Sequence, residues 1–199
     1  MRTPLVLASA SPARRTTLRA AGLDPIVIVS GVDESQLVDL PPAELALQLA
    51  ELKCAAVAGR DDVPPDALVL GCDSVLELGG EALGKPTDAE NARARWRAMR
   101  GRSGVLHTGH CLREAASGRV AAATGSTTVH FAEVSDDEID AYVATGEPLH
   151  VAGAFTIDGI GGAFISGIEG DHHNVVGVSM PLLRELVLEL GHGWPDLWA

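Results

Sequence analysis

The sequence predicts a mixed α/β fold in which helices flank an elongated, mixed β-sheet. Continuous apolar runs of strand length, such as Leu68–Cys72, alternate with segments whose apolar residues recur every three or four positions, as on one face of a helix. Two long strand-like segments also flank the turn at Ser117–Gly118, which indicates an antiparallel hairpin beside the helical crossovers of a partly parallel sheet. With 199 residues, 46% of them hydrophobic, the chain is expected to form a single domain over residues 1–199.

Start and stop signals order the elements of the N-terminal third. Ser11 can cap the first helix and Pro12 suits its first turn, because serine accepts free backbone N–H groups and proline lacks one. The expected elements are a strand over residues 5–8, a helix from Ser11 to about Gly22, a strand over residues 26–29, a polar loop with Asp33 and Glu34, and a helix from Pro41. The apolar stripe expected on this second helix, with Lys53 beside it, is formed by Leu45, Leu49, Leu52 and Ala56.

A buried central strand, hairpins and capped helices complete the order. Leu68–Cys72 is apolar throughout, so this strand should be buried on both faces and end at Asp73. The later elements are expected to be a hairpin turn at Gly79–Gly80, a helix from a capping box at Thr87 to Met99, paired strands over residues 104–113 and 119–131, a second capping-box helix from Ser135 to Gly146, a glycine-rich and strand-like stretch over residues 152–170, and a last helix over residues 181–190.

The charge of the chain limits its partners. The formal net charge of −12 argues against nucleic acid, because phosphate backbones are held by clustered cations, but a small polyanion can bind if the few cations converge. No apolar run is long enough for a membrane-spanning helix, so no membrane partner is expected. Cys54, Cys72 and Cys111 are odd in number and widely spaced, which favours free thiols in a reducing cytoplasm over a zinc site or disulfides.

Two arginines stand where a helix normally favours acidic residues. Arg14 and Arg15 fall in the first turn of the first helix, where the dipole is positive and backbone N–H groups are unpaired. An anion such as a phosphate bound there would account for them. Pairing with nearby carboxylates in this acidic chain accounts for them equally well, so both interpretations stay open.

Other polar residues in loops and at strand ends are ambiguous in the same way. Asp73 follows the buried strand at the end where ligands commonly bind in sheets flanked by helices, although Asp-Ser also commonly ends a strand. Glu34, or its neighbour Asp33, lies in a polar loop, and Lys85 lies in a constrained turn between glycine and proline. The pair His172–His173 suggests a metal, but adjacent histidines point in different directions and no spaced third ligand accompanies them.

Several short motifs occur in a fixed order over nearly the whole chain. They are Leu7-Ala8-Ser9-Ala10-Ser11-Pro12 with Arg14-Arg15, Gly31-Val32-Asp33-Glu34, Gly71-Cys72-Asp73-Ser74, Gly84-Lys85-Pro86-Thr87-Asp88, Thr145-Gly146-Glu147-Pro148, Ala152-Gly153-Ala154-Phe155, Gly159-Ile160-Gly161-Gly162 and Asn174-Val175-Val176-Gly177. In this order the chain resembles the Maf family of nucleoside triphosphate pyrophosphatases, also described as septum formation Maf-like proteins, from Leu5 to about Leu190.

The resemblance implies a fold similar to that of inosine-triphosphate pyrophosphatases, with two α/β lobes around a central cleft that holds the active site. It implies hydrolysis of a nucleoside triphosphate to the monophosphate and pyrophosphate, clearance of non-standard nucleotides as a role, and Mg²⁺ or Mn²⁺ as cofactor. A homodimer would fit the family. Matched motif by motif, Asp73 takes the general-base position, and the other polar active-site positions fall on Ser9, Arg14, Glu34, Lys53 and Lys85, with Arg15 as an added phosphate contact.

Cleavage of a phosphoanhydride requires neutralisation of a polyanion and a positioned water. Arg14, Lys53 and Lys85 can hold phosphate oxygens, while Glu34 and Asp73 are hard oxygen ligands suited to Mg²⁺. A carboxylate bound directly to the metal would be a poor proton acceptor. We therefore expect Asp73 to orient or deprotonate a water, with Glu34 as the direct ligand of the metal.

Three positions depart from the family branches with known preferences. Members that prefer thymidine and uridine triphosphates have Arg after the Ser-Pro, Thr after the catalytic Asp and Gln before the Gly-x-Gly-Gly segment, whereas this chain has Ala13, Ser74 and Asp158. Ala13 also differs from the tryptophan typical of the branch that acts on 7-methyl-GTP. An acceptor such as Asp158 suits a base with exposed N–H donors, so guanine or cytosine is expected.

A nucleotide-binding regulator with little turnover is the alternative, because the family has been linked to arrest of cell division and to septum formation. A missing catalytic carboxylate would favour this alternative. Asp73, Glu34, Lys53 and Lys85 are all present, so the sequence favours the enzyme.

Overall fold

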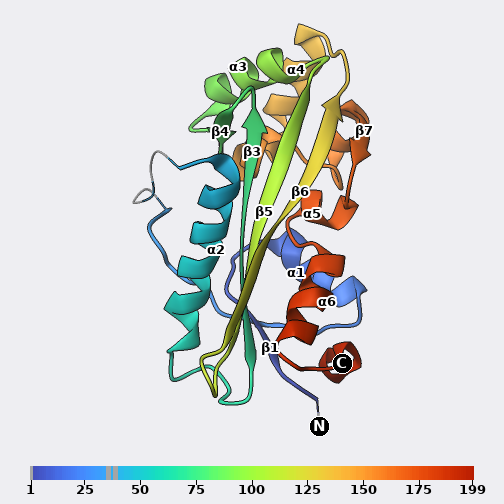
Figure 1. Cartoon of the computed structure of the whole chain (residues 1–199). Helices are drawn as coiled ribbons and strands as arrows, with labels where there is room; N and C mark the ends of the chain where they lie inside the picture. The colour runs from blue at the N-terminus through green and yellow to red at the C-terminus, as the bar shows by residue number, and fades with distance from the viewer. Residues whose placement is uncertain (1, 35–36, 38–39) are drawn as a thin grey trace.

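The computed structural model describes residues 2–34, 37 and 40–199, arranged as Figure 1 shows. The strands are β1 (Leu5–Leu7), β2 (Ile26–Val27), β3 (Leu68–Leu78), β4 (Glu81–Leu83), β5 (Ser103–Glu114), β6 (Val120–Phe131) and β7 (Ile165–Glu169). The helices are α1 (Pro12–Ala20), α2 (Pro42–Ala58), α3 (Ala89–Met99), α4 (Asp136–Ala144), α5 (His172–Val176) and α6 (Met180–Glu189). Short 3₁₀ turns cover Glu147–His150, Ala152–Ala154, Ile160–Phe164 and Trp194–Leu197.

All of these strands belong to one seven-stranded sheet. Its order is β2-β1-β3-β5-β6-β7, with β4 paired to β3. β1 pairs in parallel with β2 and β3, whereas β3, β4, β5, β6 and β7 pair antiparallel. The mixed sheet flanked by helices that the sequence predicts is therefore confirmed.

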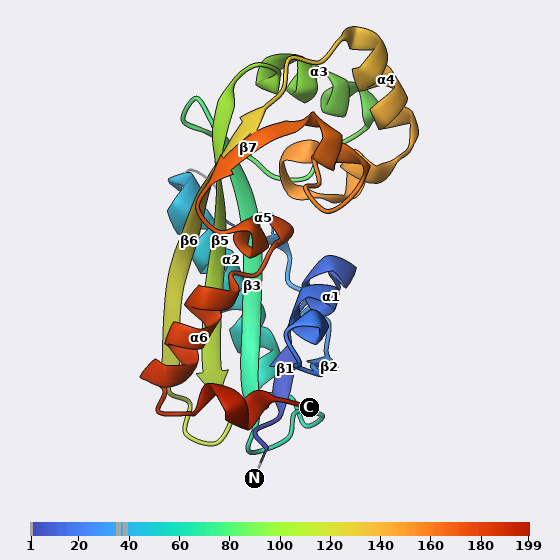
Figure 2. The same cartoon turned by 90° about the vertical axis from the view of Figure 1, so that its right-hand side faces the viewer.

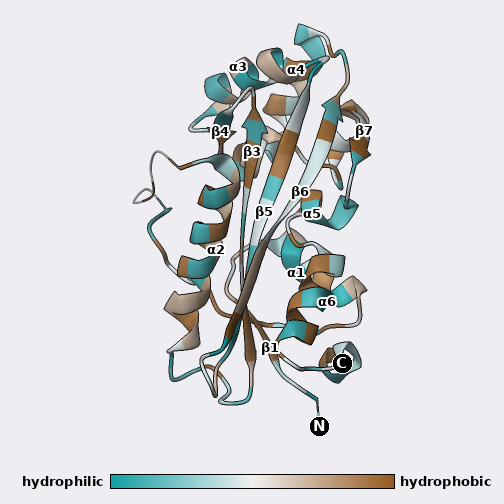
Figure 3. Cartoon of the chain, viewed as in Figure 1, coloured by the Kyte–Doolittle hydropathy of each residue, from teal (hydrophilic) through white to brown (hydrophobic). Residues whose placement is uncertain are grey.

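Helices cover both faces of the sheet. Figure 1 shows α2 along one face, and Figure 2, turned by 90°, shows α6 along the other with α1 beside β1. In Figure 3 the apolar colour covers β1 and the neighbouring ends of β3 and β5, and it recurs on the opposite half of β5 and on β7. Within the described ranges, no helix combines the length and the apolar character needed to cross a membrane.

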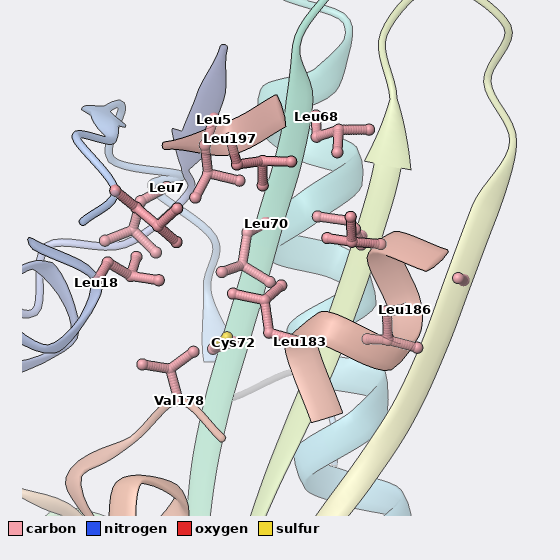
Figure 4. Close-up of a cluster of buried hydrophobic side chains, with 14 of the residues drawn as sticks. Leu5, Leu7, Leu18, Leu68, Leu70, Cys72, Val178, Leu183, Leu186 and Leu197 are labelled. Atoms are coloured by element: carbon pink, nitrogen blue, oxygen red, sulfur yellow. The ribbon is translucent and has the colours of Figure 1, made fainter. Parts of the chain in front are cut away.

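Two hydrophobic clusters occupy opposite ends of the sheet. In the first, Leu70 of β3 packs with Leu18 of α1 and Leu183 of α6 (Figure 4). In the second, Trp96 of α3 packs edge-on against Phe131 of β6, with ring centroids 5.8 Å apart. A third cluster, which includes Ala50 and Cys54 of α2 and Val69 of β3, lies between α2 and the sheet. The division into two lobes stays a prediction.

The apolar stripe predicted for α2 is wrong in part. Leu52 is 40% exposed, and the buried face consists of Ala46, Leu49, Ala50, Lys53, Cys54 and Val57. The cause is the close approach of α2 to Gly71 of β3 and Gly109 of β5, since a Cβ at Gly71 would lie only 2.7 Å from the Cys54 backbone nitrogen. Small residues on α2 permit this approach. It brings Lys53, which was expected beside the apolar stripe, into the middle of the buried face.

β3 is longer than the sequence predicts. The expected strand ends at Asp73, but β3 continues to Leu78, and Asp73 pairs with Gly109 in the middle of the ladder to β5. The ladder extends past the polar pair Asp73–Ser74 because β5 supplies partners on both sides of it. The prediction that Asp73 stands at a strand end is therefore wrong.

Local signals were correct at some helix ends and incomplete elsewhere. The capping box at Ser135 is confirmed, with Glu138 closing it. At the other predicted box, Asp88 rather than Thr87 caps the helix, accepting a backbone N–H of α3 at 2.8 Å. Residues 152–170 form mainly 3₁₀ turns and only one strand, β7, and the sequence did not predict α5. A five-residue helix is too short for hydrophobic periodicity to detect.

The three cysteines lie in the interior as free thiols, as the sequence predicts. Burial raises the pKa of Cys72 to about 12, so this thiol stays protonated at neutral pH. Protonated, buried thiols pack as small apolar side chains.

His110 of β5 fixes the start of α6 from inside the core. Its Nε2 atom accepts the Ser179 N–H at 2.8 Å, and its Nδ1–H donates to the Thr108 carbonyl oxygen at 2.9 Å. The Nε2 atom can accept only in the neutral imidazole, because both ring nitrogens carry hydrogen in the protonated form. Burial lowers the pKa of His110 from 6.5 to about 4, so the ring stays neutral in the folded chain at neutral pH.

This histidine should make the stability fall in mildly acidic solution. The unfolded chain binds a proton at His110 below about pH 6.5, whereas the folded chain binds it only near pH 4. Between pH 7.5 and pH 5.0, wild type should therefore lose about 2 kcal/mol more free energy of unfolding than His110→Gln. Urea unfolding of both proteins at the two pH values measures this, and equal losses would contradict it.

Candidate active site

The predicted site residues meet at a gap along one side of β3. β1 pairs with β3 only as far as Leu70, and β4 pairs with it only from Leu76. No strand among the described residues pairs with Gly71–Val75 on that side, and we call this stretch the open edge of β3. Asp73 and Ser74 lie in it, and their side chains point to opposite faces because side chains alternate along a strand.

On the α2 face, one ammonium group joins two carboxylates. Lys53 Nζ lies 2.7 Å from Glu34 Oε1 and also contacts Asp73 Oδ1. Lys53 and Asp73 are only 7% and 8% exposed, and Glu34 reaches them from the loop before α2. The fold thus brings three of the predicted site residues from separate parts of the chain to one point.

On the α1 face, Arg14 is held by neutral oxygens alone. Its Nε donates to the Gly177 carbonyl oxygen at 2.7 Å, and its two terminal nitrogens donate to Ser9 Oγ at 3.2 Å and Ser74 Oγ at 3.0 Å. The residue is 8% exposed, and no carboxylate among the described residues lies within ion-pairing distance of it. A buried charge without an opposite charge is costly, so this position favours an anionic ligand. Arg15, the neighbouring candidate, is exposed.

A chain of hydrogen bonds behind Ser74 supports Arg14. Thr108 Oγ1 donates to the Asn174 carbonyl oxygen at 2.9 Å, so Ser74 Oγ, 3.0 Å away, donates to Thr108 and accepts from Arg14. Neither Thr108 nor Asn174 is among the site residues predicted from the sequence. Asn174 stands in one of the motifs that indicated the family, whereas no pattern in the sequence pointed to Thr108.

Three cations act on Glu34. Burial by itself would raise the pKa of Glu34, but the hydrogen bond from Lys53 and the charges of Lys53, Lys85 and Arg14 lower it. Lys85 itself is exposed, and Arg95 of α3 anchors its turn by donating to the Lys85 carbonyl oxygen at 3.4 Å. The predicted phosphate-binding cations therefore converge, which is what an acidic chain needs to bind a polyanion.

Ser74 and Asp158, two of the residues predicted to select the base, lie in different places. Ser74 is turned toward Arg14, whereas Asp158 is exposed and lines a pocket of about 630 Å³ formed with α1, α5, α6 and Trp194. We call this the α1 pocket. Ala13 precedes Thr17, which lines this pocket, by one helical turn, so both face the same side of α1.

Two carboxylates form the candidate metal site. Glu34 and Asp73 meet at the Lys53 ammonium, and the described residues contain no group of three or more His, Cys, Asp or Glu side chains that could hold a metal ion. Mg²⁺ is commonly bound by one or two carboxylates together with substrate phosphates and water. The donor set fits a cation of that kind. His172 and His173 line the α1 pocket instead.

The open edge of this mixed α/β sheet holds a buried arginine on one face and two carboxylates joined by a lysine on the other, an arrangement that suits a phosphorylated ligand. A family model described as Maf-like protein matches residues 4–190. The chain therefore belongs to the Maf family, as the order of its motifs indicated.

Relatives from several bacteria share nearly the full length of the chain. A protein of Streptomyces coelicolor named nucleoside triphosphate pyrophosphatase is 63% identical over 195 residues, which cover 98% of this chain and 94% of the relative. A protein of the same name from Salinispora tropica is 61% identical and covers 98% of this chain and 87% of its own length. One from Nocardia farcinica is 52% identical, with 100% and 98% covered.

Proposed function

We propose that this chain is a hydrolase of nucleotide metabolism, a nucleoside triphosphate pyrophosphatase that cleaves the α–β phosphoanhydride bond. The observation that supports this most is the buried Arg14 guanidinium, which has no carboxylate partner among the described residues and lies across β3 from a lysine that joins two carboxylates. The relatives at 61–63% identity are named for this activity. Clearance of non-standard nucleotides is the role we propose for it.

Each residue has a separate task in this reaction. Arg14, oriented by Ser9, binds phosphate oxygens, and the capped start of α1 adds backbone N–H donors. Lys53 neutralises charge on the α2 face, and Asp73 orients the attacking water and takes its proton. Arg15 and Lys85 are exposed and would contact the outer part of the phosphate chain.

Glu34 and Asp73 would hold a Mg²⁺ or Mn²⁺ ion, with Glu34 as the direct ligand. When bound, the ion supplies charge neutralisation on the phosphates and makes the attacking water easier to deprotonate. Lys53 contacts both carboxylates, so it holds them together against their mutual repulsion.

A nucleotide panel tests the reaction directly. Pyrophosphate and orthophosphate release would be measured for common nucleoside triphosphates with Mg²⁺ and with Mn²⁺. We expect pyrophosphate and the monophosphate as the only products. Release of orthophosphate alone would contradict the assigned bond, and binding without turnover would favour the regulator of cell division.

The same panel tests the base preference. Ala13 leaves room on the α1 pocket side of its helix, and Asp158 offers a carboxylate acceptor at that pocket. Ser74 lies away from this pocket, where its hydroxyl group accepts a hydrogen bond from Arg14. We expect GTP or CTP to give a kcat/KM about tenfold above that of UTP and dTTP, because an acceptor in the pocket pairs with N–H donors of the base. A clear preference for UTP and dTTP would contradict this.

Metal and nucleotide should bind cooperatively. Two carboxylates are too few to complete the coordination of Mn²⁺ without phosphate oxygens, so a non-hydrolysable nucleotide analogue should tighten Mn²⁺ binding at least about tenfold. Isothermal titration calorimetry with and without the analogue measures this. Glu34→Gln should remove most of the effect. Equal Mn²⁺ affinity in both titrations would contradict the proposed two-carboxylate site.

The single domain, the homodimer and the cytoplasmic location stay predictions. Cooperative unfolding in urea, sedimentation equilibrium and cell fractionation would test them in that order.

A further inference from the structure

One carboxylate at the α4 end of the sheet, that of Glu147, is bound mainly by a neighbouring loop. Glu147 Oε1 accepts from Tyr142 Oη at 2.9 Å, Thr156 Oγ1 at 2.5 Å and the Gly161 N–H at 3.0 Å, and Oε2 accepts the Ile160 N–H at 3.0 Å. Three of these four donors belong to residues 156–161. Hydrogen bonds to an ionised carboxylate are about twice as strong as neutral ones, so Glu147 organises this loop.

The loop fits closely around this carboxylate. A Cβ at Gly159 would lie 2.7 Å from Glu147 Oε2, and a Cβ at Gly161 would overlap Tyr142 Oη and lie 2.9 Å from the Thr156 carbonyl oxygen. A side chain at Gly161 would meet backbone, and a side chain at Gly159 would have to displace the Glu147 carboxylate, so the loop and the carboxylate are packed against each other. Asp158 directly precedes Gly159 in this loop.

Asp158 connects this loop to the α1 pocket. It lines the pocket together with Thr17 of α1 and Val176 of α5. Val176 directly precedes Gly177, whose carbonyl oxygen accepts from Arg14. The pocket volume of about 630 Å³ is in the range of small-molecule sites. Gly177 thus links the pocket lining to Arg14, and a nucleotide with its phosphates at Arg14 and its nucleoside part in the α1 pocket would meet Asp158.

We propose that Glu147 is a positioning residue for the nucleoside part of the substrate. It fixes residues 156–161 and thereby sets the place of Asp158 at the α1 pocket. The proposal rests on the proposed function, since it concerns the same substrate. Glu147 makes no contact with Arg14, Lys53 or Asp73, so it acts on nucleoside binding and leaves the cleavage step unchanged.

The test separates KM from kcat for GTP and UTP. Glu147→Gln should raise KM about tenfold and leave kcat within about threefold, because it disturbs binding of the nucleoside and spares the reacting phosphates. Amide hydrogen exchange at Ile160 and Gly161 should become faster in the same variant. An unchanged KM, or a loss confined to kcat, would overturn the proposal.

A double-mutant cycle tests whether Glu147 acts through Asp158. In an Asp158→Ala background, Glu147→Gln should raise KM less than about twofold, because the side chain that it positions is absent. Independent, multiplying effects would overturn the proposal. Dissociation constants of GTP, measured by calorimetry for the same four proteins, test the cycle even if wild type releases no pyrophosphate, so failure of the proposed function is recognised separately.

Two further variants control for folding. Glu138→Gln removes a carboxylate that caps α4 at Ser135, in the same part of the chain but away from the loop, and should leave KM unchanged. Thr156→Val removes one donor to Glu147 and is the substitute if Glu147→Gln does not fold. It should raise KM in the same direction by a smaller factor. A KM increase in Glu138→Gln equal to that in Glu147→Gln would show a general effect of stability and overturn the proposal.

Discussion

Asp73→Asn is expected to lower kcat about 1,000-fold while the dissociation constant of the nucleotide stays within a few-fold of wild type. Asparagine keeps the shape of the side chain and its place at the open edge of β3, where Asp73 contacts Lys53. It cannot take a proton from water. Arg14, the proposed phosphate contact, lies on the other face of β3 with its bonds to Ser9 and Ser74, so phosphate binding there should remain.

Single-turnover kinetics and calorimetry with a non-hydrolysable analogue separate these two effects. Glu77→Gln is a matched control, because Glu77 lies on the same strand and pairs with His107 at 2.9 Å outside the site. That variant should keep its kcat. Turnover of Asp73→Asn within a few-fold of wild type would remove Asp73 from the mechanism, and a large loss of nucleotide binding would show that its charge serves to hold the metal and substrate.

The place of Asp73 shows how far a strand can be predicted from its own residues. The apolar run Leu68–Cys72 identified a buried strand, and the polar pair Asp73–Ser74 was taken as its end. In the fold, β5 pairs with both halves of β3, so β3 continues past Asp73. The pairing of β1 with β3 ends at Leu70. Where a neighbouring strand stops is a tertiary property, and it is what leaves the edge of β3 beside Asp73 unpaired among the described residues.

The face of α2 shows the same limit for a helix. Leu45, Leu49 and Leu52 are the largest apolar residues at helical spacing, so the pattern favours them as the buried face. The sheet instead presents glycines to α2, and only small side chains fit against them. The helix is apolar on several sides, so its sequence alone cannot choose between these faces.

The order of the motifs predicted which residues belong to the candidate site. It did not predict which atoms these residues contact. Ser9, Arg14, Glu34, Lys53 and Asp73 all gather at the open edge of β3. Their partners come from distant parts of the chain: Arg14 Nε reaches the carbonyl oxygen of Gly177, 163 residues away. Contacts of that kind depend on how α1 and α5 pack, which no local pattern encodes.

Gly109→Ala should cost both stability and activity, because Gly109 is the residue that lets α2 approach the strand opposite Asp73. An added methyl group would overlap the Ala46 carbonyl group and lie 2.6 Å from Leu47 Cα, both in the backbone of α2. Backbone cannot rotate away as a side chain can, so the helix must move. We expect a loss of about 1–3 kcal/mol in the free energy of unfolding. A shift of α2 also separates Lys53 from Asp73, and a displacement near 1 Å can lower kcat about 100-fold.

The matched control is Gly167→Ala in β7, where the nearest atom to an added Cβ, His130 Cδ2, is 3.7 Å away. This variant should keep both its stability and its kcat. Urea unfolding and steady-state kinetics on the two variants measure the effects separately. If Gly109→Ala lost stability but kept its kcat, the spacing of α2 would not set the contact between Lys53 and Asp73. If it lost neither, the close approach of α2 to β5 would itself be contradicted. If Gly109→Ala lost both stability and kcat while Gly167→Ala lost neither, the packing of α2 on the glycines of β3 and β5 would be what places Lys53 at Asp73.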